Sequence, residues 1–278
     1  MDSTTNSKTT PSSNRNRTVR SRITSTAMLP HQFQKIEIKC VCGEKYTCYD
    51  LGPFTKAACD ECVKKFHLEE ELKIQAEALV LQEKEQRERV LRARIPFQWR
   101  DTTFENSNSK IHPGAFLSCK NYADQFTMDS KSLIIFSDVL GSGKTHLAMC
   151  VANQLLHQRR LNLRYIKAAD ILMEVRSTYN GTSKEDEKDV INRLMNTRVL
   201  VIDDLGVNAA TEWSAEIFWA IFDRRLENKL PVIVTMNYAP EDDALGTRIG
   251  NGALSRLLGM CQDNIVTFKG KDLRRSKQ

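Results

Sequence analysis

The chain has 278 residues, of which 41% are hydrophobic and 27% are charged, and its formal net charge is +6. This composition is typical of a globular protein with one sizeable core and room for a small accessory module. No apolar run is long enough to span a membrane, and the N-terminus lacks the apolar segment of a secretory signal. We therefore expect a cytoplasmic protein that does not contact a membrane.

The first thirty residues are rich in Ser, Thr, Asn and Arg, and we expect residues 1–30 to form a disordered basic tail. The C-terminus is also basic, through Lys271, Arg274, Arg275 and Lys277. Basic ends favour contact with a polyanion, although a charged tail can also simply be solvated.

Residues 31–66 are predicted to form a small zinc-binding module. Cys40 and Cys42 form one pair, Cys59 and Cys62 form a second, and sixteen residues separate the pairs. Two such pairs can close a tetrahedral site of four sulfurs, for which zinc is the usual metal. The first pair has one intervening residue where two are common, so Cys48 remains an alternative ligand. The other alternative is a set of free buried cysteines.

The segment 61–94 contains neither Gly nor Pro and is predicted to be one long helix, with residues 67–94 as a helical linker. Its thin apolar stripe suits either a solvated connector or a surface for a partner. Pro96 ends the helix. The aromatic residues Phe97, Trp99 and Phe104 then follow, and they either pack on the edge of the next domain or line a site for adenine.

Five apolar runs follow, each separated from the next by a helical pattern. The predicted strands are residues 133–136, 163–166, 199–203, 232–236 and 265–268. This alternation of strand and helix predicts an α/β domain over residues 95–278, with a five-stranded parallel sheet flanked by helices.

Residues 138–145 match the phosphate-loop template G-x-x-x-x-G-K-[ST] except at the first position, where Asp138 replaces glycine. Gly141 and Gly143 let backbone amides approach phosphate oxygens closely. Lys144 would reach the β and γ phosphates, and Thr145 would hold Mg²⁺. We expect ATP to bind, with Asp138 serving the turn before the loop. The alternative is a degenerate loop that binds no nucleotide.

Two carboxylates, Asp203 and Asp204, end the third predicted strand, where unpaired charge would be costly to bury. Together with the phosphate loop they predict a Walker B motif. Asp203 would coordinate Mg²⁺ and Asp204 would orient or deprotonate the attacking water. Asn237, after the fourth strand, would position that water. Downstream, Arg248 and Arg256 are both candidates for an arginine finger donated to a neighbouring subunit.

The order of segments SDVLGSGKTHLA, RVLVIDDLGVNAATEW, PVIVTMNY, SRLLGMC and FKGKDLRR resembles the AAA+ ATPases of the DnaC/DnaI helicase-loader and IstB branch. The resemblance covers about residues 95–275. It implies a homo-oligomer with nucleotide at its subunit interfaces and with single-stranded DNA contacts inside the oligomer.

The expected function is that of an ATP-dependent DNA replication protein that delivers a replicative helicase to single-stranded DNA. One alternative is an IstB-like transposition helper, and another is a nucleic-acid adaptor that does not hydrolyse ATP. The expected cofactors are ATP, Mg²⁺ and Zn²⁺. The nucleotide-binding residues are predicted to be Gly141, Ser142, Gly143, Lys144, Thr145, His146 and Asp203.

Overall fold

The computed structural model describes residues 34–52, 55, 58–179, 186–207 and 211–275. The predicted disordered tail, residues 1–30, therefore lies outside the described residues. The chain divides into two compact units, Met1–Ala76 and Glu77–Gln278. The division falls within the segment predicted as a helical linker, so the proposed domain boundaries at residues 66 and 94 stay predictions.

The first unit contains an antiparallel pair of strands, β1 (Lys35–Lys39) and β2 (Lys45–Tyr49), which the sequence analysis did not predict. Gly43 lies in the connecting turn with φ of +91°, a backbone angle that glycine adopts without strain. Along both strands exposed residues alternate with half-buried ones. The hairpin therefore buries little apolar surface of its own.

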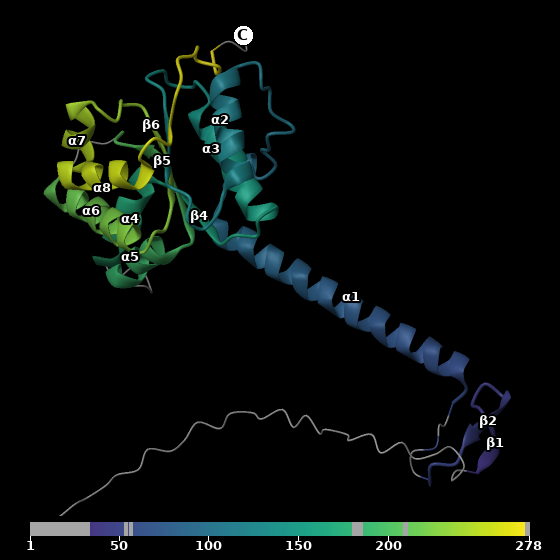
Figure 1. The fold of residues 1–278 in the computed structure, drawn as a ribbon. Helices are drawn as coiled ribbons and strands as arrows, with labels where there is room; N and C mark the ends of the chain where they lie inside the picture. Colours follow the sequence, from purple (N-terminus) through teal and green to yellow (C-terminus); the bar gives the residue numbers. More distant parts are fainter. Residues whose placement is uncertain (1–33, 53–54, 56–57, 180–185, 208–210, 276–278) are drawn as a thin grey trace, which may run out of the picture. The chain divides into compact units, whose positions relative to one another are not determined.

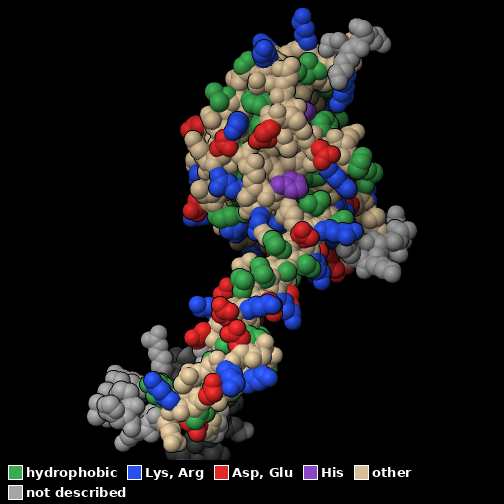
Figure 2. Space-filling view, turned by 90° about the vertical axis from the view of Figure 1, so that its right-hand side faces the viewer, with side chains coloured by type: hydrophobic (Ala, Val, Ile, Leu, Met, Phe, Trp, Pro, Cys, Tyr) green, Lys and Arg blue, Asp and Glu red, His purple; other side chains and the backbone are tan. Residues whose placement is uncertain are grey.

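Helix α1 (Asp60–Ala93) confirms the predicted long helix, and it begins within the segment assigned to the zinc module. Asp60 and Glu61 in its first turn favour the positive end of the helix dipole. Acidic and basic side chains intermingle along it (Figure 2), and apolar residues of its stripe such as Leu72 and Leu79 are exposed. The helix ends before Arg94, whose φ is +51°.

The second unit is built on a five-stranded parallel sheet, as the sequence predicts. Its strands are β3 (Leu133–Phe136), β4 (Leu163–Lys167), β5 (Val199–Leu205), β6 (Val232–Met236) and β7 (Ile265–Thr267). Their spatial order is β4-β5-β6-β3-β7, and every neighbouring pair is parallel. β7 ends one residue earlier than predicted, although the Phe268 amide still donates to the Phe136 carbonyl at 3.2 Å.

Helices cover both faces of this sheet (Figure 1). Helices α2 (Pro113–Gln125) and α3 (Lys144–His157) pack on one face. The other face carries α4 (Ala168–Tyr179), α5 (Glu187–Asn196), α6 (Glu212–Glu227), α7 (Asp243–Ile249) and α8 (Asn251–Cys261). Within β5, Val199 and Val201 enter the first core while Leu200 and Ile202 enter the second. Burial on both faces explains why the strand reads as a continuous apolar run.

The aromatic residues before the sheet belong to the domain edge. Phe104 is buried in the core and meets Phe116 edge to face, with ring centroids 5.3 Å apart. Trp99, in the short 3-10 helix η3 (Phe97–Trp99), packs against the same core, whereas Phe97 is 82% exposed. Phe104 and Trp99 therefore pack on the edge of the domain, as the packing interpretation predicts.

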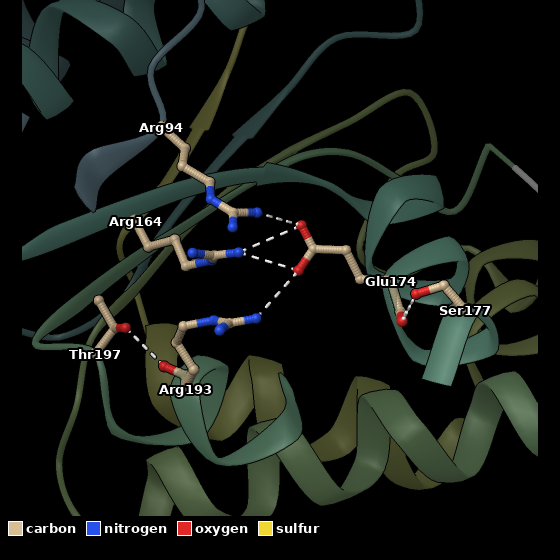
Figure 3. A network of polar contacts seen from close by, with 6 residues as sticks. All are labelled: Arg94, Arg164, Glu174, Ser177, Arg193 and Thr197. Atoms are coloured by element: carbon tan, nitrogen blue, oxygen red, sulfur yellow. Dashed lines mark hydrogen bonds and ion pairs between the residues drawn. The ribbon is translucent and has the colours of Figure 1, made fainter. Parts of the chain in front are cut away.

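A charge cluster joins the end of α1 to the sheet and its helices (Figure 3). The Glu174 carboxylate of α4 accepts from Arg94 at 2.7 Å and from Arg164 at 3.0 Å, and it lies 3.6 Å from Arg193. Arg164 is buried, so the carboxylate supplies the counter-charge that a buried guanidinium requires.

Among the described residues, no helix is both long and apolar enough to cross a membrane.

Candidate nucleotide-binding site

The phosphate loop leaves β3 and enters α3 in the way the template requires. Gly141 has a φ of +71° and Gly143 a φ of +103°, both in the region that favours glycine. Asp138 is exposed and does not adopt a positive φ. Asp138 therefore replaces the glycine of the template at a position where its backbone angle causes no strain.

Lys144 is buried at the first position of α3, and its Nζ donates to the carbonyls of Ser137 and Val139, both at 2.9 Å. Burial lowers the pKa of Lys144, and the nearby carboxylates of Asp204 and Asp138 act in the opposite direction. The ammonium is thus held at the end of β3, beside the loop amides.

Asp203 sits at the centre of the site, at the carboxyl end of β5. Its Oδ1 accepts from Thr145 Oγ1 at 2.8 Å and from Thr235 Oγ1 at 2.6 Å, and its Oδ2 accepts from Tyr165 at 2.9 Å. β6, which carries Thr235, lies between β5 and β3, so this threonine reaches both motifs. A carboxylate beside the Thr145 hydroxyl is an oxygen pair suited to Mg²⁺.

Asp204 is set apart from Asp203 by an irregularity in the sheet. The pairing of β5 with β6 shifts register between Ile202 and Leu205, and Asp204 has a left-handed φ of +57°. Its amide donates to Thr235 Oγ1 at 2.9 Å. Burial and the charge of Asp203 raise the pKa of the Asp204 carboxyl. A left-handed non-glycine residue costs about 1–3 kcal/mol, and such strain concentrates at functional sites.

The two candidate arginines occupy different surroundings. Arg248 of α7 donates to the carbonyls of Gly206 and Val207 at 3.2 and 3.0 Å, and it lines the same cavity as Asp204. Arg256 of α8 pairs with Asp223 at 2.9 Å and lies 5.4 Å from the centre of the Trp219 ring. Arg248 therefore lies near Asp204 of its own chain, whereas Arg256 does not.

The remaining predicted residues lie around the loop. Ser142 is buried within it, and Asn237 directly follows β6 and is half-buried. His146 points its Nε2 to Ser107 at 2.7 Å and stands edge-on to Trp99, with centroids 6.0 Å apart. Its imidazole is therefore engaged with the segment before α2 and not with the phosphate loop.

Sequence reasoning missed His112 and Tyr165. The imidazole of His112, just before α2, contacts the Ser142 carbonyl at 2.8 Å and lies 4.5 Å from the Phe268 ring. Tyr165 reaches Asp203 from the neighbouring strand β4. The alternation of strand residues alone could have put Tyr165 on the face of β4 that it shares with Leu163. No local signal marked His112.

The four predicted zinc ligands come together in the first unit. Their sulfurs all lie within 4.8 Å of one another, and Sγ of Cys42 is 3.7 Å from Sγ of Cys59. Tetrahedral zinc with bonds of about 2.3 Å places its sulfurs about 3.8 Å apart, so the cluster fits that metal. Cys48, on β2, is not among the four.

Backbone amides favour the thiolate form of Cys40 in this cluster. Amides of Cys42 and Cys59 lower the pKa of Cys40 to about 6, and the Cys59 amide donates to its sulfur at 3.3 Å. The sulfurs of Cys40, Cys42 and Cys59 raise the pKa of Cys62 to about 12. Four thiolates this close repel one another, and a divalent cation would remove that repulsion.

Comparisons with known proteins point to an ATP-binding family. Residues 62–278 match the family described as IstB-like ATP binding protein. The replicative helicase loader DnaC of Buchnera aphidicola subsp. Baizongia pistaciae is 29% identical over 199 residues, covering 66% of this chain and 80% of that protein. The loader DnaC of Escherichia coli K12 is 32% identical over 137 residues, covering 49% of this chain and 55% of that protein.

Solved structures agree on the fold. The crystal structure of the DnaC helicase loader aligns with a TM-score of 0.54 at 20% identity, over 63% of this chain and all of that one. The crystal structure of DnaI aligns with a TM-score of 0.52 at 16% identity, over 64% of this chain and 94% of that one. At such identities the likeness concerns the fold alone.

The parallel sheet, the phosphate loop after β3 and the carboxylate pair at the carboxyl end of β5 define a P-loop protein of the AAA+ class. Within that class, the chain belongs to the IstB-like ATP-binding family, whose match covers most of its length.

Proposed function

We propose that this protein is an ATP-hydrolysing helicase loader that delivers a replicative helicase to single-stranded DNA. The observation that carries the proposal is the 2.8 Å hydrogen bond between Thr145 and Asp203, which brings together the two residues proposed to hold Mg²⁺. The similarity to proteins named replicative helicase loader supports the choice among ATP-dependent functions.

In this proposal the phosphate loop binds the triphosphate through its amides and Lys144, while Thr145 and Asp203 hold Mg²⁺. Asp204 acts as the base or orienting group for the attacking water. Its half-buried carboxyl and the raised pKa that burial causes suit a proton acceptor. Asn237, at the end of the adjacent strand β6, positions the same water.

We assign different roles to the two arginines. Arg248 is held by two carbonyls beside its own Asp204, so it shapes that chain's loop. Arg256 is on α8 and is paired with the half-buried Asp223. It is the better candidate for a finger donated to a neighbouring subunit, where a phosphate would replace Asp223 as the counter-charge. Assembly into a homo-oligomer would then be needed for full activity.

The N-terminal unit serves as the helicase-binding part, with zinc held by Cys40, Cys42, Cys59 and Cys62. ATP favours the assembled state that holds DNA, and hydrolysis releases the loader. The DNA lies inside the oligomer, and the protein acts in the cytoplasm.

Helicase delivery to closed circular single-stranded DNA tests the proposal. The full chain with ATP should place a replicative hexameric helicase on the circle, measured as helicase retained on DNA. Asp204→Asn should bind ATP with about wild-type affinity and hydrolyse it at least about a hundredfold more slowly. Helicase bound equally with and without the chain would contradict the proposal.

A second candidate is a transposition helper that assembles on duplex DNA and activates a transposase. The family match favours it, since IstB gives the family its name. Preference for duplex over single-stranded DNA in the ATP-bound state would support this function over helicase loading.

A further inference from the structure

The last turns of α1 and the end of α3 enclose a groove of about 770 Å³. Gln86 of α1 closes one side of it, since its side-chain amide contacts Nδ1 of His157 at 2.9 Å. Val90, which also lines the groove, packs against the first core. All of the lining residues belong to the second unit, and none of them belongs to the nucleotide site. The fold of the second unit alone therefore shapes the groove.

Four arginines line this groove, which we call the arginine groove: Arg87, Arg89, Arg100 and Arg160. Arg89 and Arg160 donate to the side chains of glutamines on α1, and Arg100 donates to the Ile95 carbonyl at 3.3 Å. Within the part of the chain that the structure describes, none of the four forms an ion pair. Arg92 on the same helix, by contrast, is paired with Glu88 at 2.8 Å. The guanidinium charges of the groove are therefore available to a ligand.

The lining is positive overall, because two carboxylates, those of Glu83 and Glu85, face four guanidinium groups. Lys and Arg side chains gather around the last turns of α1 (Figure 2). A concave surface of one charge sign raises the local concentration of the opposite ion. Guanidinium groups suit phosphate oxygens in particular, since their planar N–H donors match two oxygens at once. The groove therefore favours a ligand that carries phosphates.

An exposed aromatic ring lies beside these charges. Phe97 of η3 is 82% exposed, whereas Trp99 of the same short helix packs against the core. The Arg100 guanidinium lies 5.8 Å from the centre of the Phe97 ring. No core contact accounts for a phenylalanine at this position. Its ring is available to a flat partner that stacks on it.

We propose that the arginine groove binds the backbone of a single-stranded nucleic acid and that one of its bases stacks on Phe97. Basic grooves with aromatic rings are typical of single-strand binding, because every unpaired base has a face that can stack. A duplex keeps its bases stacked on one another, and an acidic peptide would leave the ring unused. The inference does not depend on ATP binding or on helicase delivery.

Fluorescence anisotropy with a labelled oligothymidylate of about 20 nucleotides tests this site in the full chain without ATP. The double variant Arg87→Gln and Arg100→Gln should weaken binding by about tenfold or more. It should also flatten the slope of log affinity against log salt by about 1.4, since each phosphate contact contributes about 0.7. Phe97→Ala should weaken binding by about fivefold and leave that slope unchanged, because stacking releases no counterions.

The matched control is the double variant Lys84→Gln and Arg92→Gln, which removes the same charge from α1 outside the groove. Its affinity should stay within about twofold of the wild type. Phe97→Trp should keep the affinity, because indole also stacks on a base. The altered side chains are all exposed, so every variant should melt at the temperature of the wild type.

Wild-type affinity in the Arg87 and Arg100 variant would overturn the inference, as would no binding of oligothymidylate by the wild type. Equal affinity for a duplex of the same length, or no effect of Phe97→Ala, would exclude the stacked base. Displacement of the oligonucleotide by polyglutamate at equal charge concentration would make the groove a site for acidic peptides. Failure of helicase delivery would refute the proposed function and leave these titrations unchanged.

Discussion

The nucleotide site and the cysteine cluster are both built from residues far apart in the sequence, but different forces hold them in place. The carboxyl ends of β5, β6 and β3 meet at one edge of a sheet buried on both faces, so the core itself positions Asp203, Thr235 and the loop. The cysteines come from a turn after β1 and from the start of α1, around which little apolar surface is buried. Packing specifies the first site, and the metal itself would have to specify the second.

Removal of zinc should have the largest effect, because structural zinc contributes about 10 kcal/mol or more to the folding of a small module. Cys59→Ser should retain less than half an equivalent of zinc by metal analysis and should lose the ordered amide signals of the first unit. Cys48→Ser is the matched control, since Cys48 lies outside the cluster, and it should keep one equivalent.

The Cys59→Ser variant also tests whether the nucleotide site is independent of the cysteine cluster. ATP affinity of Cys59→Ser should equal that of the wild type, because the second unit has its own core. Loss of ATP binding together with zinc would show that the two sites are not independent.

Loss of Lys144 should have the next largest effect. Lys144→Ala should weaken ATP by about a hundredfold or more, since a buried ammonium beside the phosphates is removed. Zinc content should be unchanged. Lys188→Ala removes an exposed lysine of α5 and should bind ATP normally in the same titration. Equal affinities of the two variants would exclude the phosphate loop as the binding site.

The charge cluster around Glu174 tests the packing of the second unit. Glu174→Gln leaves the buried Arg164 without its counter-charge and should lower the free energy of unfolding by about 2–3 kcal/mol. Glu227→Gln breaks an exposed pair with Arg224 and should cost at most about 0.5 kcal/mol. Urea denaturation of the two variants measures both free energies of unfolding. A similar small loss in both would mean that Glu174 is effectively solvated.

The sequence predicted the fold well where local pattern and burial coincide. The strands of the sheet read as short, mostly apolar segments, although Arg164 interrupts β4, and α1 contains neither Gly nor Pro. The loop, Asp203 and the four cysteines were found because their chemistry requires fixed spacing.

Other features of the structure were not predicted, most of them because they depend on tertiary neighbours. The β1–β2 hairpin is an exception, because Lys35–Lys39 alternates polar and apolar residues as strands do, and the prediction of a zinc module did not use this pattern. Tyr165 and His112 join the site through strand order and through a loop before α2. The left-handed φ of Asp204 and the path of the chain at Leu273 over Gly141 arise from packing between distant segments. His146, next to Thr145 in sequence, turns toward Ser107 for the same reason.

We expect the nucleotide site to work although aspartate replaces the first glycine of its loop. Asp138 is exposed and has no positive φ, so its cost is electrostatic. Two charges about 8 Å apart repel by about 2 kcal/mol at an effective dielectric of 20, and by about 0.5 kcal/mol in water. Because Asp138 is exposed, we expect its repulsion with the phosphates to be near the lower of these two energies.

Titration of Mg-ATP into the wild-type chain and into Asp138→Gly tests whether the loop binds nucleotide with aspartate at this position. We predict that the wild type binds ATP and that restoring glycine improves affinity by less than about tenfold. No detectable binding by the wild type, with micromolar binding by Asp138→Gly, would mean that Asp138 disables the site and that the protein is a nucleic-acid adaptor that does not hydrolyse ATP.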